Sequence, residues 1–201
     1  MRQSLYLVGQ VAVLAALGLN IQDVSALERS GLQLNNGHQY LRLNITNKGG
    51  IVELLDTNTR QVDGESTFNG MTLEEGVNIA LEKIRFGYAT SATAGGETDP
   101  TLLRYSNLYD DVPAVLANAD LVITQQGKDI LSVPVRNLLV GSKSERTAGA
   151  VDAYESDVIR VLRSKTPVKI SLRFPKGASI GNAANHFIEL HLIGAATARK
   201  G

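Results

Sequence analysis

Cysteine and tryptophan are absent from this chain of 201 residues, and aromatic residues are scarce, with four Phe and six Tyr. Without a thiol the chain cannot form a disulfide bond, a thiolate zinc site or a cysteine nucleophile. The absence of cysteine favours a reducing compartment. With so few aromatic rings, a platform for stacking sugars is difficult to build.

An excess of charge of either sign is also absent: Lys and Arg total 20, Asp and Glu total 20, and the formal net charge is zero. A protein that neutralises many phosphates needs a surplus of positive charge. We therefore expect no specific nucleic-acid binding. Zero net charge also removes the repulsion between copies, which suits a protein that works in an assembled state.

The most apolar stretch is LYLVGQVAVLAALGL, residues 5–19. Arg2 and the apolar run fit a signal peptide, but the residues that follow Ala16 make a poor cleavage site. A membrane-spanning helix needs about 20 mostly apolar residues, and this run has 15. We favour an apolar helix in a core or at an interface. The main alternative is a helix that dips into a membrane surface or meets copies of itself, and a signal peptide is the other.

A helix over this stretch is apolar nearly all round, so we expect it to be covered on most sides by neighbouring copies or by a membrane surface. The residues expected to face this partner are Leu5, Leu7, Val8, Val11, Leu14 and Leu17. Residues 21–31 are predicted as a second, short helix. The sequence thus divides into an N-terminal helical arm, residues 1–31, and a folded domain, residues 32–201.

After the arm, the apolar residues alternate as in half-buried strands. Residues 39–46 and 51–56 are predicted to form a hairpin. The clearest hairpin joins residues 119–125 to residues 129–135 through a turn in which Gly127 can take a positive φ. Pro134 cannot donate a hydrogen bond to a neighbouring strand, so its strand is expected at a sheet edge or on a bulge.

Residues 71–90 fit two interpretations. A capping box at residues 72–75, followed by a helical stripe of apolar residues, favours a helix. Gly76 weakens a helix, and residues 84–90 alternate as in a strand. The strand interpretation, which we favour, requires a phase slip after Leu81 that a β-bulge supplies.

Two strong strand patterns occur near the carboxy terminus. Residues 168–174 and 186–194 both alternate, and the residues of the second that we expect to face the core are Ile188, Leu190 and Leu192. Glu189 and His191 fall on the opposite face of this strand. We expect that face to be solvated.

The whole pattern amounts to about eight strands, with residues 111–118 as a short helical turn and residues 142–156 as a long loop or a weak helix. Alternating rather than continuous apolar character indicates antiparallel sheets. The sequence therefore predicts a mainly β protein, an antiparallel β-sandwich with an N-terminal apolar helix. A single jelly roll or a related sandwich fits the strand count.

Few residues could carry chemistry. His38, His186 and His191 are the only imidazoles, and a Glu189/His191 metal site would need a third ligand that the sequence does not identify. The two aspartates at 110–111 could bind a hard cation, but helix capping explains them more simply. No phosphate-binding glycine loop or nucleophile elbow is present. We predict no catalytic, metal or cofactor site, and no enzyme.

The hairpin NADLVITQQGKDILSVPVRNLL, the strand PVKISLRFPKGAS and the closing strand NHFIELHLIG follow one another in the second half of the chain. Their order resembles the carboxy-terminal part of the jelly-roll capsid proteins of tailless icosahedral bacterial viruses, over about residues 39–193. The resemblance implies a structural virion protein, a shell subunit that assembles in the host cytoplasm through contacts with its own copies and other shell proteins. It also implies an N-terminal helix at a subunit interface or against an internal membrane.

Many shells of this lineage use two fused jelly rolls, whereas this chain has the length for one, which implies one of two cooperating shell proteins or a minor vertex protein.

Two other classes of function remain open. A ligand-binding or adhesive β-sandwich would recognise its ligand through loops at one end. An enzyme on this scaffold would need histidines and carboxylates clustered on one inner sheet face, which the phases of the three histidines do not favour.

Overall fold

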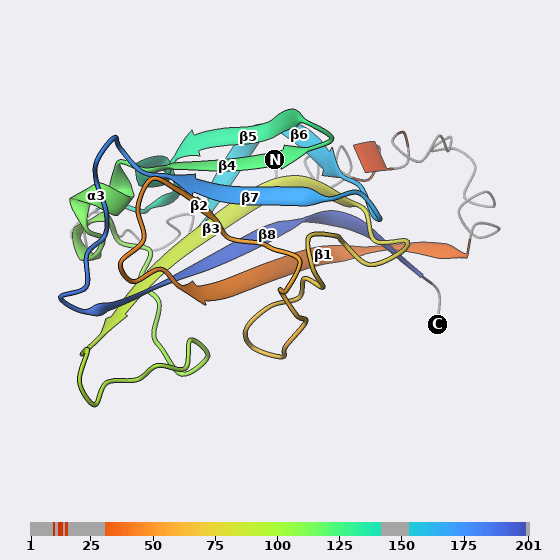
Figure 1. The fold of residues 1–201 in the computed structure, drawn as a ribbon. Coiled ribbons are helices and arrows are strands. Elements are labelled where there is room, and N and C mark those ends of the chain that lie inside the picture. Colours follow the sequence, from red (N-terminus) through yellow and green to blue (C-terminus); the bar gives the residue numbers. More distant parts are fainter. Residues whose placement is uncertain (1–9, 11, 14, 16–30, 142–152, 200–201) are drawn as a thin grey trace.

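Two four-stranded antiparallel sheets make up most of this computed structural model, which describes residues 10, 12, 13, 15, 31–141 and 153–199. The sheets pack against each other, and each combines strands that lie far apart in the sequence (Figure 1). The predicted class, a mainly β protein with antiparallel sheets, is confirmed.

The first sheet has the strand order β1-β8-β3-β6. Its strands are β1 (Leu32–Asn44), β8 (Asn185–Arg199), β3 (Ile79–Ser91) and β6 (Tyr154–Leu162). β8 pairs with the whole of β1 on one side and with β3 on the other. It is therefore a central strand without a free edge over most of its length.

The second sheet has the order β2-β7-β4-β5. Its strands are β2 (Ile51–Glu53), β7 (Val168–Arg173), β4 (Asp120–Gln125) and β5 (Lys128–Pro134). Within residues 31–141 and 153–199, the short helical segments are η1 (Tyr109–Asp111), α3 (Ala114–Ala117) and η2 (Val135–Leu138). The helical turn expected within residues 111–118 is confirmed by α3.

Alternate residues of both sheets meet in one contiguous apolar core. Burying each of these aliphatic side chains contributes about 1.5 to 3 kcal/mol relative to leaving it in water. The inward positions predicted for the closing strand are confirmed, because each is at most 1% exposed. Core-facing residues of β8, β4 and β7 that are at most 1% exposed include Ile188, Leu190, Leu192, Leu121, Ile123, Val168, Ile170 and Leu172.

β3 contains the bulge that the strand interpretation required. Leu81 and Lys83 pair with consecutive residues of β8, so Glu82 is the additional residue. The bulge lets apolar residues on both sides of it face the core, namely Ile79, Leu81, Ile84 and Phe86. The strand is confirmed for residues 79–91, whereas the capping-box helix is wrong, because residues 71–78 form turns and extended chain.

The hairpin of β4 and β5 is confirmed. Gln126 and Gly127 form its two-residue turn with φ values of 55° and 71°, and a turn with two positive φ angles matches the twist of the flanking strands. Pro134 is the last residue of β5, which is an edge strand. Its expected position at a sheet edge is confirmed.

The hairpin predicted between residues 39–46 and 51–56 is wrong. β1 pairs with β8, whereas β2 pairs with β7 in the other sheet. The chain crosses between the sheets in residues 45–50, where Asn47 and Gly50 take φ values of 59° and 68°. A local turn signal indicates where the chain changes direction, but the burial of apolar faces across distant strands decides which strands pair.

The predicted N-terminal helix lies almost entirely outside the described residues. The same holds for residues 21–30 of the second predicted helix and for residues 142–152 of the predicted loop. The partner-facing positions that fall outside are Leu5, Leu7, Val8, Val11, Leu14 and Leu17. The described arm residues 10, 12, 13 and 15 have helical backbone. Of the helices in the described part of the chain, none has the length and apolar character that crossing a membrane requires.

We predict that Gly194→Ala destabilises the fold by about 3 kcal/mol or more, at the upper end of the cost of overpacking. A Cβ at Gly194 would overlap the carbonyl oxygen of Ala80 on the neighbouring strand, next to the β3 bulge. Urea unfolding of the variant measures the loss. Asn35→Ala, at an exposed position of β1, is the control, and equal stability of the two variants would contradict the prediction.

Candidate functional site

A polar cluster lies on the outer face of the first sheet, the face turned away from the second sheet. It joins Glu189 and His191 of β8 to His38 and Arg42 of β1. The antiparallel register sets Arg42 opposite Glu189, and alternate residues of each strand share a face. The structure thus brings together three residues that the sequence singled out: His38, Glu189 and His191.

Glu189 is the centre of this cluster. Its Oε2 accepts a hydrogen bond from Arg42 Nε at 2.7 Å, and its Oε1 lies 2.6 Å from His191 Nε2. That second contact lies within ion-pair distance. Arg42 also donates a short hydrogen bond from Nη1 to the carbonyl oxygen of Gly64. One guanidinium group therefore links the sheet to a loop.

The two imidazole rings of the cluster contact each other directly. His38 Nε2 and His191 Nδ1 lie 2.5 Å apart, with ring centroids 4.8 Å apart and ring planes 12° from parallel. A hydrogen bond between two ring nitrogens holds one hydrogen, so one of the two facing atoms must act as the acceptor. This contact therefore excludes a state in which both facing nitrogens carry a proton.

Two loops cover the cluster. In the loop that follows β2, the N–H of Gly64 donates to the hydroxyl of Tyr40 on β1 at 2.9 Å. The loop that follows β3 contributes Tyr105, whose side chain lies so close to Gly87 that a Cβ there would come to 2.9 Å from it. The guanidinium carbon of Arg42 lies 5.5 Å from the ring centre of Tyr40 and 5.7 Å from that of Tyr105. Both loops are thus fixed to the sheet by aromatic rings and Arg42.

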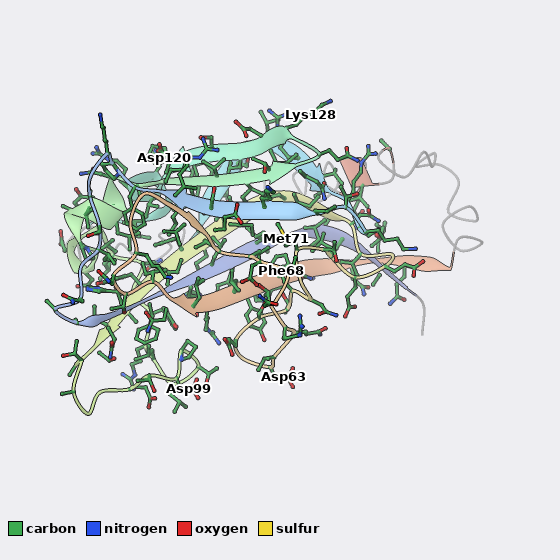
Figure 2. The ribbon with its side chains drawn as sticks, in the orientation of Figure 1. Asp63, Phe68, Met71, Asp99, Asp120 and Lys128 are labelled. Carbon is green, nitrogen blue, oxygen red and sulfur yellow. The ribbon has the colours of Figure 1, made fainter. Side chains whose placement is uncertain are left out.

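The outer face expected to be solvated is in fact buried at Glu189 and His191, which are 5% and 9% exposed. Figure 2 labels Asp63 and Asp99 on the two loops, which lie on the side of the first sheet away from the second sheet. Strand alternation predicts which face a residue occupies, but it does not predict a distant loop that covers this face. The expectation was therefore wrong for a reason of tertiary packing.

Electrostatics fix the charge state of Glu189. Burial alone would raise the pKa of this carboxyl, but the contacts with His191 and Arg42 outweigh burial and lower the pKa to about 2. Burial is also the largest cause that lowers the pKa of His38, and the neighbouring His191 acts in the same direction. Glu189 is therefore an anion at neutral pH, held by cationic and imidazole partners.

A carboxylate beside an imidazole can support acid–base chemistry, but here the second ring nitrogen of His191 faces His38 rather than a substrate space. Within the described ranges, no three metal-ligating side chains converge to hold an ion. Through the contacts of Arg42 and Tyr40, the cluster holds β1, β8 and the two covering loops together.

His186, the third histidine, is not part of this cluster. Its Nδ1 lies 2.6 Å from the hydroxyl oxygen of Tyr88. Burial lowers the pKa of His186 and raises the pKa of Tyr88 to about 12. The helix-capping role expected for the aspartates at 110–111 is wrong, since Pro113 precedes α3 and Asp111 accepts a hydrogen bond from Ser106 at 2.5 Å.

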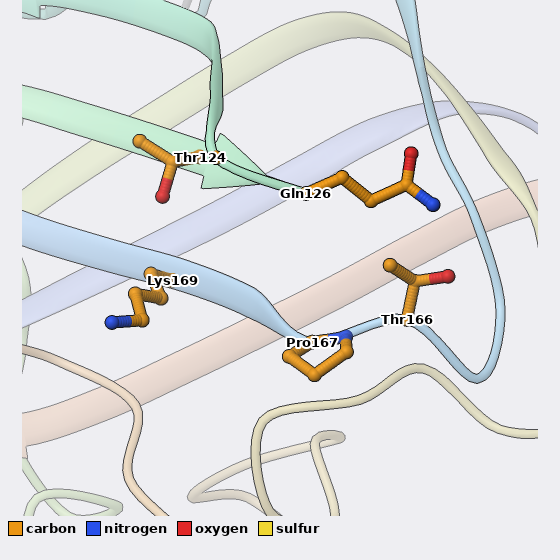
Figure 3. A pocket seen from close by; sticks show the side chains of 6 residues that line it. Thr124, Gln126, Thr166, Pro167 and Lys169 are labelled. Atoms are coloured by element: carbon orange, nitrogen blue, oxygen red, sulfur yellow. The ribbon is translucent and has the colours of Figure 1, made fainter.

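A separate hollow of about 400 Å³ lies at one end of the second sheet, between the β4–β5 turn and the segment before β7 (Figure 3). Lys169 is the one titratable side chain in its lining, next to threonine, glutamine and proline side chains. The residues that line the hollow are Thr124, Gln126, Gly127, Thr166, Pro167 and Lys169.

Comparison with models of known protein families and with curated protein sequences finds no match to this chain. The geometry of the described residues is therefore the evidence from which a role is inferred.

Sequence reasoning missed Arg42, Tyr40 and Tyr105. Arg42 and Tyr40 occur in an alternating strand, where an outward polar side chain is ordinary. Tyr105 lies in a loop with no regular pattern. A signal was present only at Gly87, a glycine inside a strand, which often marks a close approach by another segment.

We predict that Glu189→Gln destabilises the fold by about 2 to 3 kcal/mol, because it removes the buried anion that pairs with Arg42. The value lies below that for a fully buried pair, since the Arg42 side chain is 23% exposed. The control is Glu155→Gln, which removes the partner of Lys83 at 2.8 Å, where the carboxylate side chain is 40% exposed. The control should cost less than about 1 kcal/mol, and equal losses in urea unfolding would contradict the prediction.

We predict that stability falls as the pH decreases below about 6.5. Burial lowers the pKa of His38 and of His186 from the ordinary value of 6.5, so the unfolded chain binds protons there more readily than the folded chain. The stabilisation is complete above pH 6.5 and is lost as the pH falls through the lowered values. Urea unfolding between pH 8 and pH 5 measures it.

The double variant His38→Gln, His186→Gln should flatten this part of the pH profile. A second loss of stability should remain between pH 4.5 and about 2, because the pKa of Glu189 has an ordinary value of 4.5 and is about 2 in the folded protein. Unchanged stability of the natural chain from pH 7 to pH 5 would contradict the assigned role of the two histidines.

Proposed function

We propose that the two sheets form a single jelly roll. In this fold an antiparallel hairpin of eight strands rolls up, so that the first strand pairs with the eighth, the second with the seventh, the third with the sixth and the fourth with the fifth. The observed pairs β1–β8, β2–β7, β3–β6 and β4–β5 support this assignment. This set of pairs is the observation that carries the functional proposal.

We propose that the chain is a structural virion protein, a self-assembling shell subunit of a tailless icosahedral bacterial virus. Jelly rolls occur in viral capsids, in lectins and in enzymes of the cupin type, and the fold alone does not choose between them. A reaction site inside the roll would need a lined cavity between the sheets. Here the inner faces form a contiguous apolar core, which favours a role carried by the outer surfaces.

The exposed apolar side chains of the domain support a protein with several neighbours. Ile51 of β2 is 72% exposed, Leu102 in the loop after β3 is 68% exposed, and Val158 of β6 is 54% exposed. β2 and β6 are edge strands of different sheets, so Ile51 and Val158 do not belong to one continuous surface of a single sheet. A shell subunit needs contact surfaces on more than one side.

The partners in this proposal are copies of the chain and other shell proteins. The N-terminal helix, residues 5–19, lies at a subunit interface or against an internal membrane, and the place of the protein is the virion, assembled in the host cytoplasm. The zero net charge favours assembly over specific nucleic-acid binding. The protein is proposed to be no enzyme and to need no cofactor.

We predict that the purified full-length protein forms closed particles or regular trimers, pentamers or hexamers. A variant that lacks residues 1–20 should lose these assemblies, because it lacks the apolar helix. Light scattering measures the mass of each protein, and negative-stain imaging shows the particle shape. If both proteins are monodisperse monomers at high concentration, the proposal of a shell subunit fails.

A ligand-binding or adhesive β-sandwich is the second candidate, favoured by the hollow in Figure 3 at one end of the second sheet. Its polar lining, with Thr124, Thr166 and Lys169, could donate hydrogen bonds to a sugar or another polar ligand. A glycan array distinguishes this candidate from the first. Specific micromolar binding by a monomer, abolished by Lys169→Ala, would favour adhesion over assembly.

A further inference from the structure

The outer face of the first sheet also carries an apolar patch. Ala80 of β3 and Ala195 of β8 lie opposite each other in register, and both are completely buried. They belong to a small apolar cluster separate from the core between the sheets. We call these sheet residues the outer-face patch: Leu34, Ala80, Ala195, Ile159 and Val161.

Val13 of the N-terminal arm occupies this patch. Its side chain is completely buried against Ala80 and Ala195, and Ala12 beside it is partly buried. Ala15, two residues further along, is exposed. The two alanines are short, so they leave room in the sheet surface that a valine side chain fills. The arm therefore touches the sheet through one face.

We propose that this contact is exchanged on assembly: Val13 occupies the outer-face patch of its own subunit when the subunit is free, and the patch of a second copy when subunits join. The inference rests on the proposed function of assembly. It adds the receiving surface, the residue that enters it and the identity of the partner, which is a second copy of this chain.

The length of the arm permits such an exchange. Fifteen residues, 16–30, separate Ala15 from Gly31 at the start of the folded domain. Fifteen residues span about 22 Å as a helix, the conformation predicted for most of this segment, and up to about 50 Å when extended, whereas the radius of gyration of a compact domain of about 170 residues is about 16 Å. A neighbour's patch is therefore within reach. The exchanged contact is chemically the same in both states, which makes swapping between copies inexpensive.

Charge favours a second copy over a lipid surface as the partner of the arm. The arm, residues 1–31, carries only two basic residues, Arg2 and Arg29, and they are balanced by the acidic Asp23 and Glu28. Helices that lie in a membrane surface usually present many Lys and Arg residues to the lipid headgroups. The arm lacks this cationic face, whereas the outer-face patch offers it an apolar surface of matching shape.

The cysteine-free chain allows a direct test. Chains with Val13→Cys alone are mixed with chains carrying Ala195→Cys alone, allowed to assemble and treated with a short bismaleimide. A cross-link between the two kinds of chain can form only between copies, and we expect it in the assembled fraction. If the assembled fraction contains no such cross-link, while Val13→Cys, Ala195→Cys in one chain cross-links internally, the exchange is excluded.

A locked variant separates the exchange from assembly itself. Chains with both cysteines are cross-linked internally while free, and we expect them to form about a tenth or less of the particles of the same chains without cross-linker. Val13→Ala, which removes two buried methyl groups, should weaken docking about tenfold, and Ala15→Ser at the exposed position should not. The pair Val13→Cys, Leu34→Cys replaces the first pair if Ala195→Cys disturbs the sheet.

The outcomes distinguish the two proposals. If locked and unlocked chains assemble equally well, the exchange is wrong and the shell subunit stands. If unlocked chains do not assemble under any tested condition, both the shell subunit and the exchange are wrong.

Discussion

The constraint on which the rest of the structure depends is the burial of β8 on both of its faces. β8 pairs with β1 on one side and with β3 on the other, and its residues from His186 to Leu192 are all less than 10% exposed. A charged residue in such a strand is tolerated only when it is paired. Glu189 therefore requires Arg42 and His191, and Arg42 in turn contacts both covering loops, at Gly64 and at Tyr105.

The outer face of the first sheet changes from polar to apolar along β8. The polar cluster lies at Glu189 and His191, and the outer-face patch lies at Ala195. The six steps along the strand from Glu189 to Ala195 correspond to about 20 Å. Between them stands Gly194, where the β3 bulge leaves no space for a side chain. The bulge at Glu82 keeps the apolar residues on both sides of it facing the core. Along the same part of the sheet, the outer face changes from the polar cluster to the outer-face patch.

Local patterns predicted the local features of this fold. Alternation identified the inward residues of β7 and β8, the phase slip identified the bulge, and the missing donor of Pro134 identified an edge strand. What the sequence could not supply was pairing over long distances. Arg42 and Glu189 are 147 residues apart, and the turn at Gly50 looks the same whether the next strand joins its neighbour or crosses to the other sheet. The loop that covers Glu189 depends on Tyr105, a residue that no periodic pattern in the sequence predicts.

The closed interior also limits where this protein can act. The inner faces of the two sheets meet in an apolar core, so a partner must be recognised on an outer face, at an edge strand or at an end of the molecule. The outer face of the first sheet is partly occupied by the chain itself, by two loops over the polar cluster and by Val13 on the patch. The loop at Gly64 is held by hydrogen bonds to Tyr40 and Arg42, whereas Val13, the buried residue among the described part of the arm, makes apolar contacts with the sheet. Of these three covering segments, the arm is the one whose place the arm of another copy can take without leaving a buried charge unpaired.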